Sequence, residues 1–298
     1  MNAAHADQIQ RFSFTEGPVR GQWVRLQGVL EGLSLRQSYP ENVSGLLGEM
    51  LAAAALLADG IKFEGTVALQ SRGPGPLTMV LAECRSRHLL RGIARWPDEQ
   101  PLPESDSMLE LLGGGRLAIT LLSGDNGHSY QGLVGIEGAA LSANLERYFA
   151  TSEQLPTRLQ FAAHDAAVTG LLLQRLPDAP AATSFEQDHN DAFWAEIGML
   201  AGTLGSGELA RLPPSTLLRR LFAGHPIALT APRALRFECT CSRDRSRGAL
   251  KALGRDDLLE LLEEQNEISV TCEICGATET FDAIDVHALL EDQAPRLH

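Results

Sequence analysis

The sequence predicts an α+β fold: a mixed helix and antiparallel-sheet domain, then a helical linker, then a small C-terminal unit with four cysteines. Two observations predict this fold class. Short strand-like runs, divided by turn residues, are mixed with helical patterns and lack the regular strand–helix alternation of a parallel sheet. In addition, four of the five cysteines lie close together near the C-terminus, between residues 239 and 275.

Length and composition are those of a folded chain. With 298 residues, the chain is long enough for about two domains. Hydrophobic residues make up 44% and charged residues 21% of the sequence, which favours a packed core over disorder. The net charge is −13, and binders of nucleic acid or anionic membranes need basic patches. We therefore expect neither nucleic acid nor membrane among the partners.

The N-terminal region shows no basic stretch followed by an apolar segment, so we expect no secretory signal and a cytoplasmic protein. The longest apolar run, residues 46–58, is too short to span a membrane and is interrupted by Glu49, so it is predicted to be a buried helix. In a reducing cytoplasm, clustered cysteines bind metals or take part in redox chemistry more often than they form permanent disulfides.

The first 185 residues mix helical and strand-like patterns. A helix is predicted to begin at Pro40-Glu41-Asn42, because apolar residues then repeat at helical spacing, and another is expected over residues 140–155. A hairpin loop is predicted at residues 124–127. Strands are predicted over residues 66–70, 77–84, 89–96, 116–123, 130–138, 157–163 and 169–176.

Residues 186–235 are predicted to form a helical linker. A stretch rich in proline, alanine and polar residues (177–188) leads into it, and Asn190 or Asp191 would cap its first helix. A second helix would begin after Pro213-Pro214, with Ser215 as its cap.

The first linker helix carries an apolar stripe. If exposed, such a stripe is a candidate surface for binding client proteins. The linker is too short to build its own core, so it is either a fixed extension of the main domain or a detachable cover. The residues of the stripe are Phe193, Trp194, Ile197, Leu200 and Leu204.

Two cysteine pairs define the last segment, residues 236–298. Cys239 and Cys241 form a CxC motif, and Cys272 and Cys275 form a CxxC motif about thirty residues later. Four thiolates are the ligand set of a closed tetrahedral zinc site, so the segment is predicted to bind one Zn²⁺ ion. Gly276 follows the second pair, where a turn of this kind often needs a positive φ.

The predicted zinc site could be structural or part of a switch. A segment this small buries only a marginal core, and zinc contributes roughly 10–16 kcal/mol to the folding of such units. Each pair is close enough in sequence to form its own disulfide. A disulfide that closes so short a loop would contribute only about 2 kcal/mol to the stability of the segment. Oxidation should therefore release the metal and unfold the segment. The alternatives are a constitutive zinc ribbon that binds a protein or nucleic acid, and a thiol oxidoreductase.

The rest of the chain carries no recognisable enzyme motif, and we expect a protein that is not an enzyme. Gly73 and Gly75 fall short of a phosphate-binding loop, and residues 130–138 lack the nucleophile of a GxSxG motif. Cys84 lies in a strand-like run and is expected to be a small buried hydrophobe. His287 is expected on a surface helix, because four thiolates already fill a tetrahedral site.

These motifs resemble those of a known family, the 33 kDa chaperonins, which are redox-regulated heat-shock holdases of bacteria. The resemblance covers nearly the whole chain, in the same order. It is carried by RGIAR (91–95), YQGLVGIEG (130–138), SEQLPTRL (152–159), FECTCSRDR (237–245), CEICG (272–276) and FDAIDVHAL (281–289).

The resemblance implies an ATP-independent chaperone that binds unfolding proteins under oxidative stress. Cys239, Cys241, Cys272 and Cys275 would bind zinc when reduced and form the disulfides 239–241 and 272–275 when oxidised. The linker would then unfold, the protein would dimerise, and apolar surface would bind clients. Residues 1–185 would be the chaperone core, 186–235 the linker, and 236–298 the zinc-binding redox switch.

Overall fold

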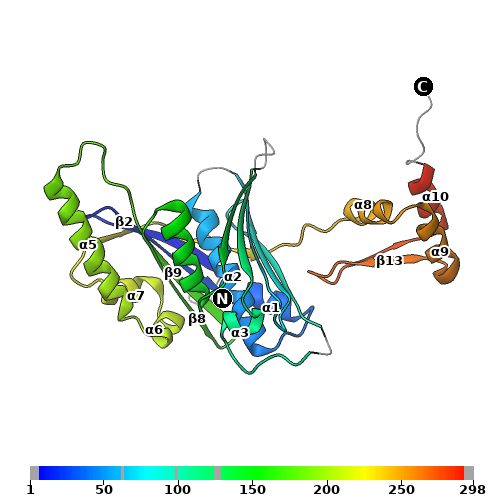
Figure 1. Cartoon of the computed structure of the whole chain (residues 1–298), viewed down its shortest axis with the longest axis horizontal. Helices are drawn as coiled ribbons and strands as arrows, with labels where there is room; N and C mark the ends of the chain where they lie inside the picture. The colour runs from blue at the N-terminus through cyan, green and yellow to red at the C-terminus, as the bar shows by residue number, and fades with distance from the viewer. Residues whose placement is uncertain (1–6, 62–63, 98–99, 124–128, 292–298) are drawn as a thin grey trace. The chain divides into compact units, whose positions relative to one another are not determined.

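The computed structural model describes residues 7–61, 64–97, 100–123 and 129–291 (Figure 1). These residues form two compact units that divide between Glu238 and Cys239. The predicted α+β fold class is confirmed, because helices are mixed with largely antiparallel sheets. The predicted hairpin loop at 124–127 lies outside the described residues.

Two six-stranded sheets form the framework of the N-terminal unit. The first has the order β10-β1-β2-β9-β8, with β11 also paired to β1, and the second has the order β12-β5-β4-β3-β6-β7. Neighbouring strands are antiparallel, except that β12 runs parallel to β5. The strands are β1 (Gln8–Phe14), β2 (Val19–Leu26), β3 (Gly65–Arg72), β4 (Met79–Arg85), β5 (Leu89–Arg95), β6 (Arg116–Ser123), β7 (Ser129–Gly135), β8 (Thr157–His164), β9 (Ala167–Arg175), β10 (Ile227–Leu229), β11 (Arg233–Ala234) and β12 (Arg236–Phe237).

Helix α2 (Glu41–Gly60) lies between the two sheets and contacts strands of both. Its buried side chains, such as Leu47 and Met50, share one apolar cluster with inward-facing residues of both sheets. The predicted start at Pro40–Asn42 is confirmed, because Pro40 is the N-cap. By length and hydropathy alone α2 could cross a membrane, but 72% of its apolar window is buried inside the protein.

Three shorter helices complete this core. They are α1 (Gly28–Ser34), α3 (Met108–Leu112) and α4 (Leu141–Tyr148). The single helix predicted over residues 140–155 changes character partway, because a π-helical turn, Phe149–Glu153, replaces its last part. The Tyr148 hydroxyl donates to the Glu153 carboxylate at 2.6 Å, which ties the π-turn back to α4.

Helices α5 (Ser184–Gly202), α6 (Ser206–Arg211) and α7 (Pro214–Leu221) cover the face of the first sheet that is turned away from α2 (Figure 1). We call residues 184–222 the helical cover. Polar bonds also join the two layers: Arg25 donates to the carbonyl of Ala210 at 2.7 Å, and Gln160 to the carbonyl of Ala201 at 2.9 Å. Cover and sheet share an apolar cluster of Phe12, Phe14, Val19, Trp23, Ala162, Leu171, Leu173, Phe193, Ile197, Ala201, Leu209, Ala210, Leu217, Leu218 and Phe222.

The helix caps predicted for the cover are wrong. Helix α5 begins at Ser184, because Thr183 and Glu186 form a capping box in which each side chain bonds the backbone N–H of the other residue. Asp191 lies inside the helix, where it pairs with Arg175 at 2.8 Å. Ser215 is also inside its helix, since α7 begins at Pro214.

We expect Gly17→Ala to loosen the helical cover. A Cβ on Gly17 would lie 2.3 Å from Cδ1 of Phe193. That ring is held between Phe14 and His225, at centroid distances of 5.6 and 5.4 Å, so it cannot move aside without disturbing the cluster. Overpacking of this kind costs about 1–3 kcal/mol, and hydrogen exchange along α5 should rise.

The matched control for this substitution is Gly198→Ala. Gly198 lies in α5, the helix that carries Phe193, and a Cβ on Gly198 would meet no atom within 4 Å. Alanine also favours helix formation by up to about 1 kcal/mol over glycine. Equal exchange in both variants would contradict the prediction.

Candidate metal centre

The C-terminal unit is small and has little apolar core. It consists of α8 (Arg243–Leu253), α9 (Arg255–Gln265), the hairpin of β13 (Ile268–Thr271) and β14 (Thr278–Phe281), and α10 (Ala283–Glu291). A unit of this size needs a further source of stability besides hydrophobic burial. Its buried apolar residues are Leu250, Leu258, Ile268, Phe281, Val286, Leu289 and Leu290.

The first cysteine pair, Cys239 and Cys241, immediately precedes α8. Ser242 caps this helix by accepting a bond from the backbone N–H of Arg245. Arg243 then anchors the helix start to the hairpin and α10. Its guanidinium donates to the carbonyl of Thr280 at 2.9 Å and to Asp285 at 2.6 Å, and it lies 4.5 Å over the ring of Phe281.

The second pair, Cys272 and Cys275, occupies the turn between β13 and β14. The turn is closed by two backbone bonds, from the Cys272 N–H to the carbonyl of Ala277 and from the Gly276 N–H to the carbonyl of Cys272. Gly276 has a φ of +69°, as the sequence predicted. Glycine enters this left-handed region without the steric cost that a Cβ imposes.

The four sulfur atoms gather into one cluster. All four lie within 4.8 Å of one another, with Cys239 and Cys272 at 3.7 Å and Cys241 and Cys275 at 3.2 Å. Tetrahedral zinc with Zn–S bonds of about 2.3 Å would place its sulfur ligands about 3.8 Å apart. The four free thiols could therefore hold a metal ion, and both their number and their spacing fit zinc.

The thiols of the cluster differ in acidity. Burial would raise the pKa of Cys272, but the N–H groups of Cys275 and Ile274 and the thiols of Cys239 and Cys275 lower it to about 7. The bond with the Cys275 thiol raises the pKa of Cys241, and burial raises that of Cys239. A metal that binds thiolates must therefore displace protons from at least two thiols at neutral pH.

Two further residues considered from the sequence lie away from the cluster. Cys84 is fully buried in the N-terminal core, and burial raises its pKa to about 12. It is the small buried hydrophobe that the sequence predicted. His287 is exposed on α10, also as expected.

The candidate client-binding residues lie in the helical cover. Phe193 and Ile197 are buried against the sheet, whereas Trp194, Leu200 and Leu204 are half-buried at the edge of the same cluster. The sequence reading missed the other half of this interface, which belongs to the first sheet. The alternation in FSF of β1 was a local signal for Phe12 and Phe14.

Comparison with known proteins shows the class to which this chain belongs: a family of chaperones. The Hsp33 protein family model matches residues 7–282, and the chain belongs to this family. The 33 kDa chaperonin of Shewanella denitrificans is 40% identical over 97% of this chain and 96% of its own length. That of Azotobacter vinelandii is 42% identical over 95% of this chain and 94% of its own.

A solved structure supports the fold. The crystal structure of the 33 kDa chaperonin from Thermotoga maritima matches with a TM-score of 0.81 over 96% of this chain and 99% of that one, at 21% identity. The protein is therefore a chaperone by family, which implies that it binds client proteins. Chaperonins are generally not enzymes.

Proposed function

We propose that this protein is an ATP-independent holdase whose activity is switched by thiol oxidation. The observation that carries the proposal is the four-thiol cluster in a unit with little other core. In this proposal Cys239, Cys241, Cys272 and Cys275 bind one zinc ion in the reduced state. Zinc supplies the cross-link that the small unit lacks.

Oxidation removes the ligands of the metal. Two thiols and one peroxide molecule give one disulfide and two waters, so two peroxides convert the cluster to the disulfides 239–241 and 272–275. Each disulfide closes a very short loop and returns little of the stability that the metal supplied. Zinc is then released and the C-terminal unit, which begins at Cys239, unfolds.

The client-binding surface in this proposal is the interface between the helical cover and the first sheet. Residues 1–185 are the chaperone core, and residues 186–235 are the linker that detaches. Detachment would expose the buried side chains of Phe193 and Ile197 together with the strand residues Phe12, Phe14 and Trp23. An apolar patch of this kind binds unfolding proteins.

The remaining parts of the proposal concern assembly and location. The oxidised protein forms a homodimer, acts in the cytoplasm, and binds neither nucleic acid nor membrane. It has no catalytic residues, since its thiols act as a sensor.

The test follows zinc and chaperone activity in the same samples. Peroxide is added to the reduced, zinc-loaded protein at raised temperature, and a chromophoric chelator reports free zinc. Suppression of the aggregation of an unfolding test protein is scored in parallel. We expect zinc release and suppression to appear together and to be reversed by a thiol reductant with zinc. Equal suppression with zinc bound and zinc lost would instead support a constitutive zinc ribbon.

A further inference from the structure

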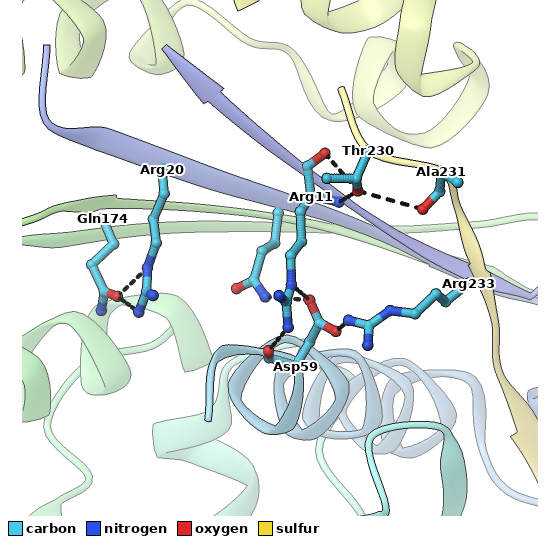
Figure 2. Close-up of polar contacts among 8 residues, drawn as sticks. Arg11, Arg20, Asp59, Gln174, Thr230, Ala231 and Arg233 are labelled. Atoms are coloured by element: carbon cyan, nitrogen blue, oxygen red, sulfur yellow. Dashed lines mark hydrogen bonds and ion pairs between the residues drawn. The ribbon is translucent and has the colours of Figure 1, made fainter. Parts of the chain in front are cut away.

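Asp59 is a buried carboxylate at the C-terminal end of α2 (Figure 2). Its side chain is 0% exposed. A buried charge is strongly unfavourable unless it is ion-paired and hydrogen-bonded. The groups that pair with Asp59 are therefore held firmly in place.

Three side chains from three strands meet the Asp59 carboxylate. Arg11 of β1 donates through Nε to Oδ2 at 2.5 Å and through Nη2 to the main-chain carbonyl of Asp59. Gln22 of β2 donates to the same Oδ2 at 2.7 Å. Arg233 of β11 forms an ion pair with the other oxygen, Oδ1. The nearby Arg20 bonds to Gln174 instead.

Arg233 differs from the other two partners in where it lies along the chain. Arg11 and Gln22 lie in β1 and β2, whereas Arg233 belongs to residues 227–238, which we call the strap and whose short strands β10 and β11 pair with β1. The strap leads in sequence from the helical cover to Cys239. Within the described chain, the bond to Asp59 is the only ion pair that residues 230–234 make.

Other contacts also attach the strap to the sheets, through the short pairings of β10 and β11 with β1 and of β12 with β5. Strand β11 has only two residues, and the side chains from Thr230 to Ala234 are exposed. Backbone bonds join the N–H of Thr230 to the carbonyl of Arg11 at 3.0 Å and the N–H of Leu235 to the carbonyl of Asp7 at 3.0 Å. At Thr230 the Gln10 amide also donates to the main-chain carbonyl at 2.7 Å, and the hydroxyl bonds to the main chain of Arg11. Beyond Thr230, the Asp59–Arg233 pair is the ion pair that anchors the strap before Leu235.

We infer that the Asp59–Arg233 pair is a latch that holds the strap, and through it the C-terminal end of the helical cover, on the N-terminal unit. The consequence for activity rests on the proposed function, since the latch would set how readily the cover is released. The bond itself is a property of the fold. Arg233 and Arg11 share one carboxylate, and burial followed by the charge of Arg11 lowers the pKa of Arg233.

Removing Arg233 and removing Asp59 have different consequences for the buried charges. Without Arg233, Oδ2 of Asp59 keeps its bonds to Arg11 and Gln22, while Oδ1 loses its ion-pair partner and the strap loses its anchor. Without Asp59, two guanidinium groups face each other with no counter-charge. Arg233→Gln is therefore the variant that disturbs the core less. The Arg233 side chain is 43% exposed, so the fold should tolerate the change.

The test compares R233Q, R233K and the matched control R236Q in the full-length, reduced, zinc-loaded protein. Arg236 lies in the same strap but is 3.8 Å from its nearest carboxylate, Glu238. Hydrogen exchange is measured at the amides of Thr230 and Leu235 and along the cover, together with zinc content and the rate at which peroxide activates aggregation suppression.

We expect R233Q to retain zinc, to exchange the strap amides up to about fivefold faster than the wild type, and to be activated by peroxide faster by a similar factor, since one partly exposed ion pair is lost. R233K keeps the charge and should resemble the wild type, as should R236Q. The latch is overturned if R233Q exchanges like R236Q, or if its strap opens without faster activation. A wild type that never suppresses aggregation when oxidised would refute the proposed function, whereas the exchange difference would still stand.

Discussion

Removing the metal from the reduced protein should unfold residues 239–291 and leave the N-terminal unit folded. The C-terminal unit buries only a small apolar cluster, whereas thiolate-bound zinc contributes roughly 10–16 kcal/mol to the folding of such units. The N-terminal unit has its own core around α2 and does not depend on the cysteine pairs. Chelation or Cys272→Ser should therefore abolish exchange protection in α8, α9, β13, β14 and α10, and leave protection in the N-terminal unit unchanged.

The control for this prediction is Cys84→Ala. It removes a cysteine that is buried in the N-terminal core, outside the cluster, so the protein should keep one zinc ion and a protected C-terminal unit. If residues 239–291 stay protected after the metal is removed, their fold does not depend on zinc, and oxidation could not unfold them by releasing it.

The four-thiol cluster could be predicted from the sequence because its signal is local. Spacings of CxC and CxxC fix which side chains can meet, and the glycine after the second pair marks the turn that presents them. The four sulfur atoms then converge as the spacing requires. No long-range packing has to be known to infer such a site.

The first sheet was harder to predict because it is covered on both faces. In β1, Ile9 packs with α2, while Phe12 and Phe14 pack under the helical cover, so the strand lacks the simple apolar–polar alternation of a half-exposed sheet. The start of α5 was missed for a different reason. The capping box of Thr183 and Glu186 is a local signal, but it lies inside a stretch that reads as a linker by composition.

Asp59 illustrates what a single sequence cannot supply. It ends an apolar helix, where an acidic residue reads as solvent-exposed, and its partners Arg11, Gln22 and Arg233 come from three separate strands. Only the folded arrangement brings them together. The sequence therefore predicts the four-cysteine cluster, whereas the contacts that hold the cover and strap in place become visible only in the structure.

Ile197→Asp should release the helical cover without oxidation. Ile197 is 0% exposed between α5 and the first sheet, so the change loses about 2–5 kcal/mol of apolar packing and adds an unpaired buried carboxylate. The sheet should remain folded, because α2 supports its other face. We expect the reduced, zinc-bound variant to lose exchange protection in α5 and to suppress aggregation as well as the oxidised wild type does.

Met199→Asp is the matched control, because Met199 lies in the same helix but is 69% exposed. The same charge is added to the same element, and the cover should stay in place. If both variants suppress aggregation, added charge rather than release of the cover is responsible. If Ile197→Asp frees α5 yet leaves clients unprotected, the covered sheet face is not the client-binding surface. Oxidation of the cysteines would then have to control client binding through a surface other than this interface.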